Sequence, residues 1–283
     1  MNRYVLTLLL VTLVWGATFP VLKLATGHLS GVEISALRFV IAAVCMAPWA
    51  WRVSQRAWRD GGVLGSLVLV SYVAQAYGLE FISSNRSAFL TSLNVLMVPL
   101  LGLAFGNRVT WTMLGAALVA CTGIGLMSWD GGAHLLADAA TVIGALAYAL
   151  YVIVLSRRAG KHNPRTLAAT QIVWMAVLGV AWMLAASLGT DRLDTLLERT
   201  NVSIWLGLCY LGIVATAGML FLQALAQRHV SADKAALVYA MEPVFAALFA
   251  WLWLAESLTW LAALGACLVV AAVVASEWKT ARA

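Results

Sequence analysis

Two charged residues stand inside long apolar segments of the sequence, where a charge needs a chemical reason. Arg38 lies within the apolar segment 32–51, and Glu242 lies within 235–255, directly before Pro243. Each would cost roughly 2.5–3.5 kcal/mol at the centre of a bilayer, so each should have a partner or a ligand. The pair could bind the carboxylate and the ammonium group of a zwitterion, and Glu242 could also carry a proton. Alternatively both are structural, with Arg38 bonding backbone carbonyls and Glu242 accepting hydrogen bonds that Pro243 leaves free.

Further candidates for substrate binding are aromatic or uncharged polar residues in other apolar segments. They are Trp15, Thr18, Tyr72, Gln75, Ser87, Thr91, Asn94, Tyr148, Tyr151, Gln223 and Tyr239. Ser87, Thr91 and Asn94 follow helical spacing and form one stripe. A cavity lined by this set would be aromatic with few polar groups, which suits amino acids or flat amphiphiles. The alternative for the Ser, Thr and Asn residues is hydrogen bonding between neighbouring helices, which is common in membrane bundles.

Prolines supply the candidate hinges. Pro20, Pro99 and Pro243 lie inside the first, fourth and ninth apolar segments. A proline removes one helical hydrogen bond and bends the helix, and broken helices at matching positions mark the substrate site in many transporters. Membrane helices also tolerate proline without any functional need.

The segments that must position these residues are membrane spans. The chain is 63% hydrophobic and 11% charged, whereas a soluble domain carries about 25% charged residues. A spanning helix needs about 20 mainly apolar residues, and ten segments qualify: roughly 4–24, 32–51, 62–80, 87–106, 109–129, 139–156, 166–187, 202–226, 235–255 and 257–277. The predicted fold class is therefore all-α, a polytopic membrane protein of ten transmembrane helices. The four cysteines all fall in these segments without metal-type spacing, which predicts free, buried thiols.

Positive charge indicates the orientation. If the N-terminus is cytoplasmic, thirteen of the eighteen Lys and Arg residues fall on the cytoplasmic side and four on the outer side, with Arg38 inside a helix. This bias follows the positive-inside rule. We therefore expect a multi-pass protein of the cell membrane, the inner membrane in a bacterium, with both termini in the cytoplasm.

The two halves of the sequence resemble each other. Asn107 to Trp111 opens the fifth segment as Glu256 to Trp260 opens the tenth, and Arg38 corresponds to Gln171 at the offset that matches Trp15 to Tyr148. The predicted division is a first repeat, 1–132, and a second repeat, 133–283, within one membrane domain. Because each half holds five helices, the second enters the membrane from the opposite side, and such inverted repeats are the plan of many secondary transporters.

The sequence resembles the EamA family of the drug/metabolite transporter superfamily. The resemblance covers nearly the whole chain and is carried by the segments 13–19 (LVWGATF), 36–39 (ALRF), 241–248 (MEPVFAAL) and 254–258 (LAESL). Asn107 departs from the pattern, because the first repeat often has the Glu seen at Glu256. The resemblance implies ten helices, a cavity between the halves and export of metabolites, amino acids among them. Within the family, a YddG-type amino-acid exporter is the narrower expectation.

Missing motifs limit the other functions. The sequence has no Walker A motif for an ATP motor and too few buried cations for a phosphorylated substrate. We expect a secondary transporter that exports amino acids, aromatic or hydrophobic ones included, by alternating access. The alternatives are export of drug-like or other non-phosphorylated metabolites, a non-transporting scaffold, and a lipid-acting membrane enzyme. We expect no enzymatic activity, no cofactor and no metal; the expected partners are a small-molecule substrate and the lipid bilayer, without nucleic acid, and a monomer is the default assembly.

Overall fold

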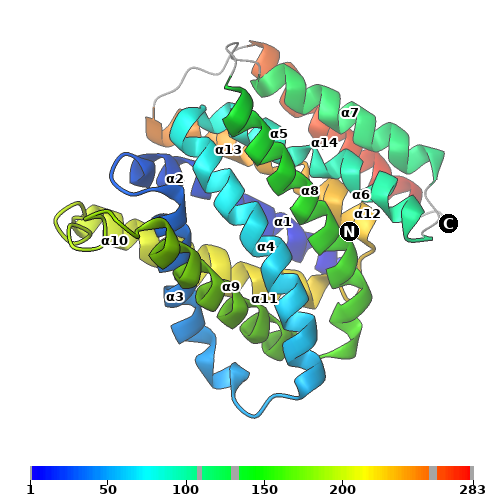
Figure 1. Cartoon of the computed structure of the whole chain (residues 1–283). Helices are drawn as coiled ribbons and strands as arrows, with labels where there is room; N and C mark the ends of the chain where they lie inside the picture. Colours follow the sequence, from blue (N-terminus) through cyan, green and yellow to red (C-terminus); the bar gives the residue numbers. More distant parts are fainter. Residues whose placement is uncertain (1, 107–109, 129–133, 255–259, 281–283) are drawn as a thin grey trace.

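The chain folds into a bundle of helices in a computed structural model that describes residues 2–106, 110–128, 134–254 and 260–280 (Figure 1). Within these residues no strand is formed. The helices are α1 Arg3–Gly16, α2 Thr18–Thr26, α3 Gly31–Ala50, α4 Gln55–Phe81, α5 Ser84–Ser92, α6 Asn94–Ala104, α7 Trp111–Ser128, α8 Leu135–Arg158, η1 Ala159–Lys161, α9 Pro164–Ala186, α10 Val202–Cys209, η2 Tyr210–Gly218, α11 Met219–Ala226, α12 Ala232–Tyr239, α13 Glu242–Leu254 and α14 Trp260–Thr280.

These helices form ten membrane-crossing segments at the places that hydropathy predicts. Eight segments of the described chain are long and apolar enough to cross a membrane, and two shorter apolar helices, Trp111–Leu126 and Trp260–Ala275, complete the set. The protein is thus all-helical and polytopic, as predicted. Helices α4 and α8 begin earlier than the predicted spans at 62–80 and 139–156. In α4 the added turns contain Arg56 and Arg59, and Arg is a good helix former; in α8 they contain Asp138, whose carboxylate is favoured in the first turn of a helix.

Three of the ten segments are interrupted near the middle. The first breaks at Ala17, the fourth at Leu93, and the ninth between α12 and α13. Pro20 and Pro243 follow their breaks within three residues, whereas Pro99 lies inside α6, six residues after the break. At the Leu93 break the Asn94 side-chain amide donates to the Thr91 carbonyl at 2.7 Å, which satisfies an acceptor that an unbroken helix would bond internally. Asn94 and Glu242 thus hold equivalent places, each as the first residue after a break.

The eighth segment contains a π-helix, which hydropathy does not predict. Its nine residues, Tyr210–Gly218, connect α10 to α11. Two side chains from other helices bond its carbonyls: the Trp15 indole N–H donates to Ala215 at 2.9 Å, and Arg38 donates to Leu211 at 3.4 Å. A π-helix is rare and frequently lies at a functional site. Here it joins α1 and α3 to the second half of the chain.

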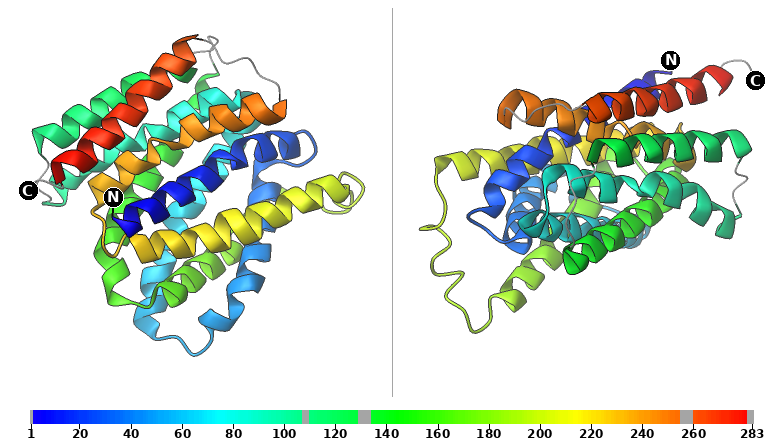
Figure 2. Two further views of the ribbon diagram at one scale, coloured as in Figure 1. Left: turned by 180° about the vertical axis from the view of Figure 1, so that it is seen from behind. Right: turned by 90° about the horizontal axis from the view of Figure 1, so that it is seen from above.

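Two packing features position the centre of the bundle. Helix α4 packs against both α8 and α9, and α7 lies beside α14 at one edge of the molecule (Figures 1 and 2). The outward surface is apolar, as lipid contact requires, with Leu24 63% and Trp251 48% exposed. The four cysteines are free, as predicted, but the prediction that they are buried is wrong. Cys45 and Cys267 are exposed, and Cys121 and Cys209 are partly so, because an apolar residue of a membrane helix can face lipid as well as protein.

Close helix contacts give a first prediction. A Cβ added at Gly16 would lie 2.6 Å from the Phe245 Cβ and 2.9 Å from the Ala246 nitrogen, where α1 meets α13, whereas a Cβ at Gly115 would meet nothing within 4 Å. Overpacking of this kind costs about 1–3 kcal/mol. We expect Gly16→Ala to lower the melting temperature of the purified protein by several degrees, and Gly115→Ala to leave it unchanged or slightly higher. Equal melting temperatures for the two variants would show that the α1–α13 contact can relax.

Candidate functional site

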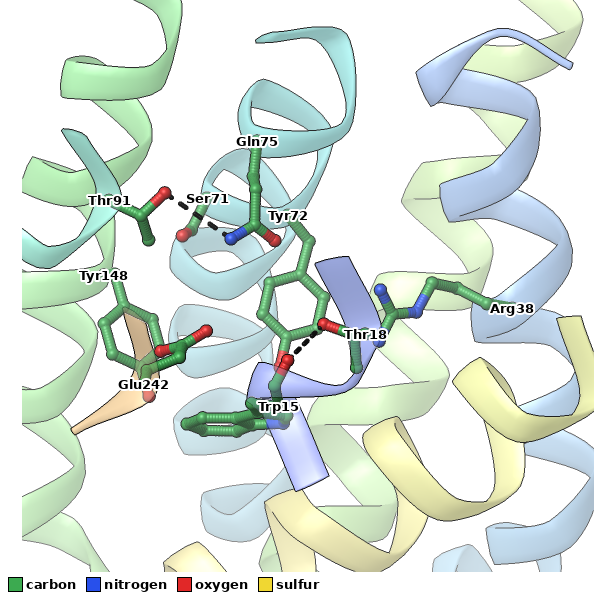
Figure 3. Close-up of a pocket in the computed structure, with 9 residues that line it drawn as sticks. All are labelled: Trp15, Thr18, Arg38, Ser71, Tyr72, Gln75, Thr91, Tyr148 and Glu242. Atoms are coloured by element: carbon green, nitrogen blue, oxygen red, sulfur yellow. Dashed lines mark hydrogen bonds between the residues drawn. The ribbon is translucent and has the colours of Figure 1, made fainter. Parts of the chain in front are cut away.

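A cavity lies in the middle of the bundle and is lined by residues from both halves of the sequence (Figure 3). Its lining residues are Trp15, Thr18, Arg38, Ser71, Tyr72, Gln75, Thr91, Tyr148 and Glu242. Eight of these nine are the site candidates given above, and the ninth, Ser71, precedes Gln75 by one helical turn and so shares its face. The cavity volume is about 20 Å³, which is room for about one water molecule. In this structure the cavity is therefore too narrow for a molecule larger than water.

Three aromatic rings form a cluster at the cavity. The ring centroids of Trp15, Tyr148 and Tyr239 lie 5.7–6.0 Å apart. The polar edge of each ring is bonded to protein: Trp15 to the π-helix, the Tyr148 hydroxyl to the Gln223 amide at 3.0 Å, and the Tyr239 hydroxyl to Gln227 at 3.5 Å. Hydrogen bonds therefore hold the orientation of the rings, whose faces can pack against an apolar or cationic group.

Arg38 reaches the cavity from α3 and is also bonded to the π-helix. Its side chain is buried; Nε donates to the Thr216 hydroxyl at 3.0 Å and Nη2 to the Leu211 carbonyl at 3.4 Å. Its Cζ lies 4.8 Å from the centre of the Tyr72 ring. Arg38 thus makes the carbonyl contact that a structural role requires, yet these bonds use only two of the five N–H groups of a guanidinium. The rest can bind an anionic group in the cavity.

Glu242 lies across Tyr72 from Arg38, next to Tyr148 (Figure 3). The residue is 8% exposed and lines the cavity. Within the described part of the chain it makes no hydrogen bond and no ion pair, with Arg38 or any other residue. A buried carboxylate without a partner is costly, so the arrangement favours a cationic ligand or a bound proton at this position.

Uncharged polar groups complete the lining. The Gln75 amide donates to the Thr91 hydroxyl at 3.5 Å, and the Thr18 hydroxyl donates to the Trp15 carbonyl at 2.7 Å, next to the break at Ala17. These groups come from α4, α5 and α2. The two interrupted segments of the first half therefore both contribute a polar residue to the cavity.

Five sequence candidates lie outside the cavity lining: Ser87, Asn94, Tyr151, Gln223 and Tyr239. Gln223 forms a bridge behind the cavity, because it donates to Tyr148 and accepts from the Tyr151 hydroxyl at 3.1 Å. Asn94 bonds the broken backbone of its own segment. Periodicity placed these residues on helix faces that point inward, but it could not distinguish the cavity wall from the layer behind it.

Several buried polar atoms have no hydrogen-bond partner in the described structure. They are Tyr72 Oη, Ser87 Oγ, Asn94 Oδ1, Asp233 Oδ1 and both amide atoms of Gln171. An unpaired buried donor or acceptor costs about 1–3 kcal/mol, so such atoms usually meet water or a ligand. Gln171, which the sequence comparison of the two halves aligns with Arg38, was not a site candidate, although the amides Gln75 and Gln223 were.

Metal ligands do not gather anywhere in the described ranges. No group of three or more His, Cys, Asp or Glu side chains there is placed to hold a metal ion. Asn107 and Glu256, on which part of the repeat argument rests, lie outside the described residues.

The known proteins with similar sequences are named as transporters or efflux pumps. An "Uncharacterized transporter" of Archaeoglobus fulgidus is 28% identical over 95% of this chain and 84% of its own length. A "Probable amino-acid metabolite efflux pump" of Salmonella typhimurium is 26% identical over 74% of this chain and 72% of its own length. A protein of the same name from Escherichia coli has the same identity and coverage. A protein crystal structure of 17% identity superposes with a TM-score of 0.76 over 100% of this chain and 99% of the other, which shows the same fold.

A family model matches both halves of the chain. The EamA-like transporter family model matches residues 2–129 and again residues 135–276, so nearly every described helix lies in a matched region. Together with the transporter names of the relatives, these matches support a membrane transporter. The chain belongs to the EamA-like transporter family.

Proposed function

We propose that the protein is a secondary transporter that exports small metabolites, with amino acids as the first substrate class. The observation that carries this proposal is the central cavity, which presents a cation, Arg38, and a carboxylate without a partner, Glu242, on either side of Tyr72. One positive and one negative group facing the same space match the two charged groups of a zwitterion. Arg38 would bind the carboxylate of the substrate and Glu242 its ammonium group, while the aromatic cluster contacts the side chain.

The two-half plan supports an alternating-access mechanism. We propose that residues 1–132 and 133–283 form two repeats of opposite orientation, and the double match to one family model is consistent with this division. The cavity takes residues from α1 to α5 of the first repeat and from α8 and α13 of the second. Because a cavity of about 20 Å³ cannot hold an amino acid, one repeat has to move against the other, and the broken helices offer places to bend.

The names of the relatives support the choice of substrate. Two proteins named as probable amino-acid metabolite efflux pumps align with most of this chain. A YddG-type exporter remains the narrower form of the proposal. We also propose a place in the cell membrane, the inner membrane in a bacterium, with cytoplasmic termini, since the charge bias of the sequence favours that orientation, and a monomeric assembly.

Uptake into proteoliposomes tests the function directly. We expect the purified protein to accelerate the uptake of apolar and aromatic amino acids at least about tenfold over protein-free vesicles, and to leave sugar phosphates excluded, because a single cation offers too little charge for a dianion. Nucleosides and unphosphorylated sugars complete the panel. Transport of drug-like compounds alone would replace the amino-acid proposal with the broader exporter, and no transport at all would favour a scaffold.

The same vesicles distinguish the two possible driving forces. A pH gradient changes the initial rate if Glu242 exchanges a proton for the substrate, and it leaves the rate unchanged in facilitated diffusion. The comparison with Glu242→Gln assigns any pH effect to this carboxyl group, because the variant keeps the shape of the side chain and loses the proton.

A further inference from the structure

One stretch of the chain, from the end of η2 through α11, bonds the aromatic side chains of the cavity. The Trp15 indole donates to the Ala215 carbonyl in η2 at 2.9 Å, and the Gln223 amide in α11 donates to the Tyr148 hydroxyl at 3.0 Å. Trp15 and Tyr148 line the cavity, whereas no residue of η2 or α11 does. The stretch therefore acts on the cavity only through the side chains that it holds.

Gln223 uses both ends of its amide. The side chain is fully buried; its Nε2 donates to Tyr148, and its Oε1 accepts from the Tyr151 hydroxyl at 3.1 Å. The two tyrosines lie one turn apart on α8, so a single amide of α11 bridges two neighbouring rings. An amide oxygen only accepts and an amide nitrogen only donates, so the bond from Tyr151 directs the nitrogen at Tyr148. The bridge thereby fixes the position of the Tyr148 hydroxyl.

Gln227 repeats this arrangement one helical turn later, on the same face. It directly follows α11 and is 2% exposed. Its Nε2 donates to the Ser156 hydroxyl of α8 at 3.0 Å, and its Oε1 accepts from the Tyr239 hydroxyl of α12 at 3.5 Å. The Tyr239 ring in turn lies 6.0 Å from the Tyr148 ring, centre to centre. Two glutamines thus support the aromatic cluster without reaching the cavity themselves.

These bonds would remain in place when the cavity is occupied. A ligand there would contact the rings of Trp15 and Tyr148 from the cavity, while Gln223 bonds the Tyr148 hydroxyl from outside the lining. Aromatic pairs prefer offset or edge-to-face arrangements, so the gain from an aromatic ligand depends on the angle at which the rings are held. We propose that Gln223 is a positioning residue that sets a preference for aromatic side chains. The proposal rests on the proposed transport of amino acids and adds a selectivity to it.

Gln223→Leu tests this role, because leucine has a similar size and offers Tyr148 no donor. Proteoliposome uptake is measured over a range of concentrations for phenylalanine and for alanine, whose methyl group is too small to stack on a ring. We expect the wild-type protein to prefer phenylalanine. The variant should raise the KM for phenylalanine about tenfold and leave the KM for alanine and both maximal rates nearly unchanged.

Thr141→Val is the matched control. Thr141 lies on α8, the helix of Tyr148, and is 1% exposed. Its hydroxyl is already bonded to the Ala137 carbonyl of its own helix at 2.8 Å. The variant therefore removes a buried hydroxyl from the same helix without touching the bridge, and it should keep the wild-type preference.

A double-mutant cycle shows whether Gln223 acts through the Tyr148 hydroxyl. Tyr148→Phe removes that hydroxyl alone and should reduce the phenylalanine preference to a similar extent. In that background Gln223→Leu should change the preference by less than about twofold, since the bond is already absent. The double variant removes both partners of the bond and so leaves neither of them unpaired, which provides a folded protein even where Gln223→Leu alone is unstable.

Tyr151→Phe approaches the bridge from its other side. Tyr151 does not line the cavity, but its hydroxyl holds the Gln223 oxygen, so its removal should lower the preference by about threefold. Additive effects of Gln223→Leu and Tyr148→Phe, an equal loss for both substrates, or an unchanged preference would overturn the positioning role and leave the transport function standing. A wild-type protein that transports both amino acids equally would do the same, and one that transports no amino acid would overturn both.

Discussion

Glu242→Gln is expected to reduce amino-acid transport by about a hundredfold while the protein stays folded. The physical reason is that the variant removes the one negative charge of the cavity lining, and the loss of one partner from a buried charge pair costs about 2–5 kcal/mol, which corresponds to roughly 30- to several-thousand-fold in affinity. The melting temperature should be unchanged or higher, because Glu242 has no partner within the described chain to lose. Uptake in proteoliposomes and thermal unfolding of the same preparation provide the two measurements.

The choice of substrate identifies what Glu242 binds. An amine without a carboxylate should depend on Glu242 as strongly as an amino acid does, whereas a carboxylic acid without an amine should not. Glu198→Gln, in the exposed connection between α9 and α10, is the control for a change of net charge and should transport normally. Normal transport by Glu242→Gln together with a lower melting temperature would instead make Glu242 a structural residue, which stabilises the helix break next to Pro243.

Arg38 should show a different combination of losses. We expect Arg38→Met to reduce transport by about a hundredfold and also to lower the melting temperature by several degrees. The substitution removes both the cavity cation and the hydrogen bonds to Thr216 and Leu211, and a hydrogen bond made by a charged group contributes about 1.5–3 kcal/mol. Arg38→Lys should keep most of the stability but little of the transport, because a compact ammonium cannot replace a forked guanidinium.

Thr216→Val separates the two roles of Arg38. The Thr216 hydroxyl accepts from Arg38 and donates to the Leu211 carbonyl at 2.7 Å, so valine weakens the support of the π-helix and leaves the charge in place. If Arg38 binds substrate, Thr216→Val should stay within about threefold of wild-type transport. A loss as large as that of Arg38→Met would assign Arg38 to the π-helix alone.

Hydropathy and charge could predict most of the fold. Ten apolar segments were located, because water excludes a 20-residue apolar helix from the surface of a soluble protein and a bilayer accepts it. The π-helix at Tyr210–Gly218 and the break at Leu93 were not predicted. The π-helix is bonded by Arg38 from a distant helix, and the break is bonded by the Asn94 side chain, and hydropathy reports neither contact. Proline marked two of the three breaks and not the third.

The cavity was predictable in part for a similar reason. Polar residues in apolar helices are costly enough to face one another, so the cavity lining consists almost wholly of residues that stood out in the sequence. Which of them touch the cavity depends on the rotation of each helix to within a fraction of a turn. Tyr148 lines the cavity and Tyr151 does not, although they are one turn apart and both bond Gln223.

The narrowness of the cavity has a consequence for the membrane itself. A continuous file of water molecules across the bundle would let protons and ions leak down their gradients. The cavity has room for about one water beside Tyr72, and fully buried side chains such as Gln223 and Tyr151 lie behind it. At this cavity the described side chains therefore leave no room for such a file of water, and their packing preserves the permeability barrier of the membrane.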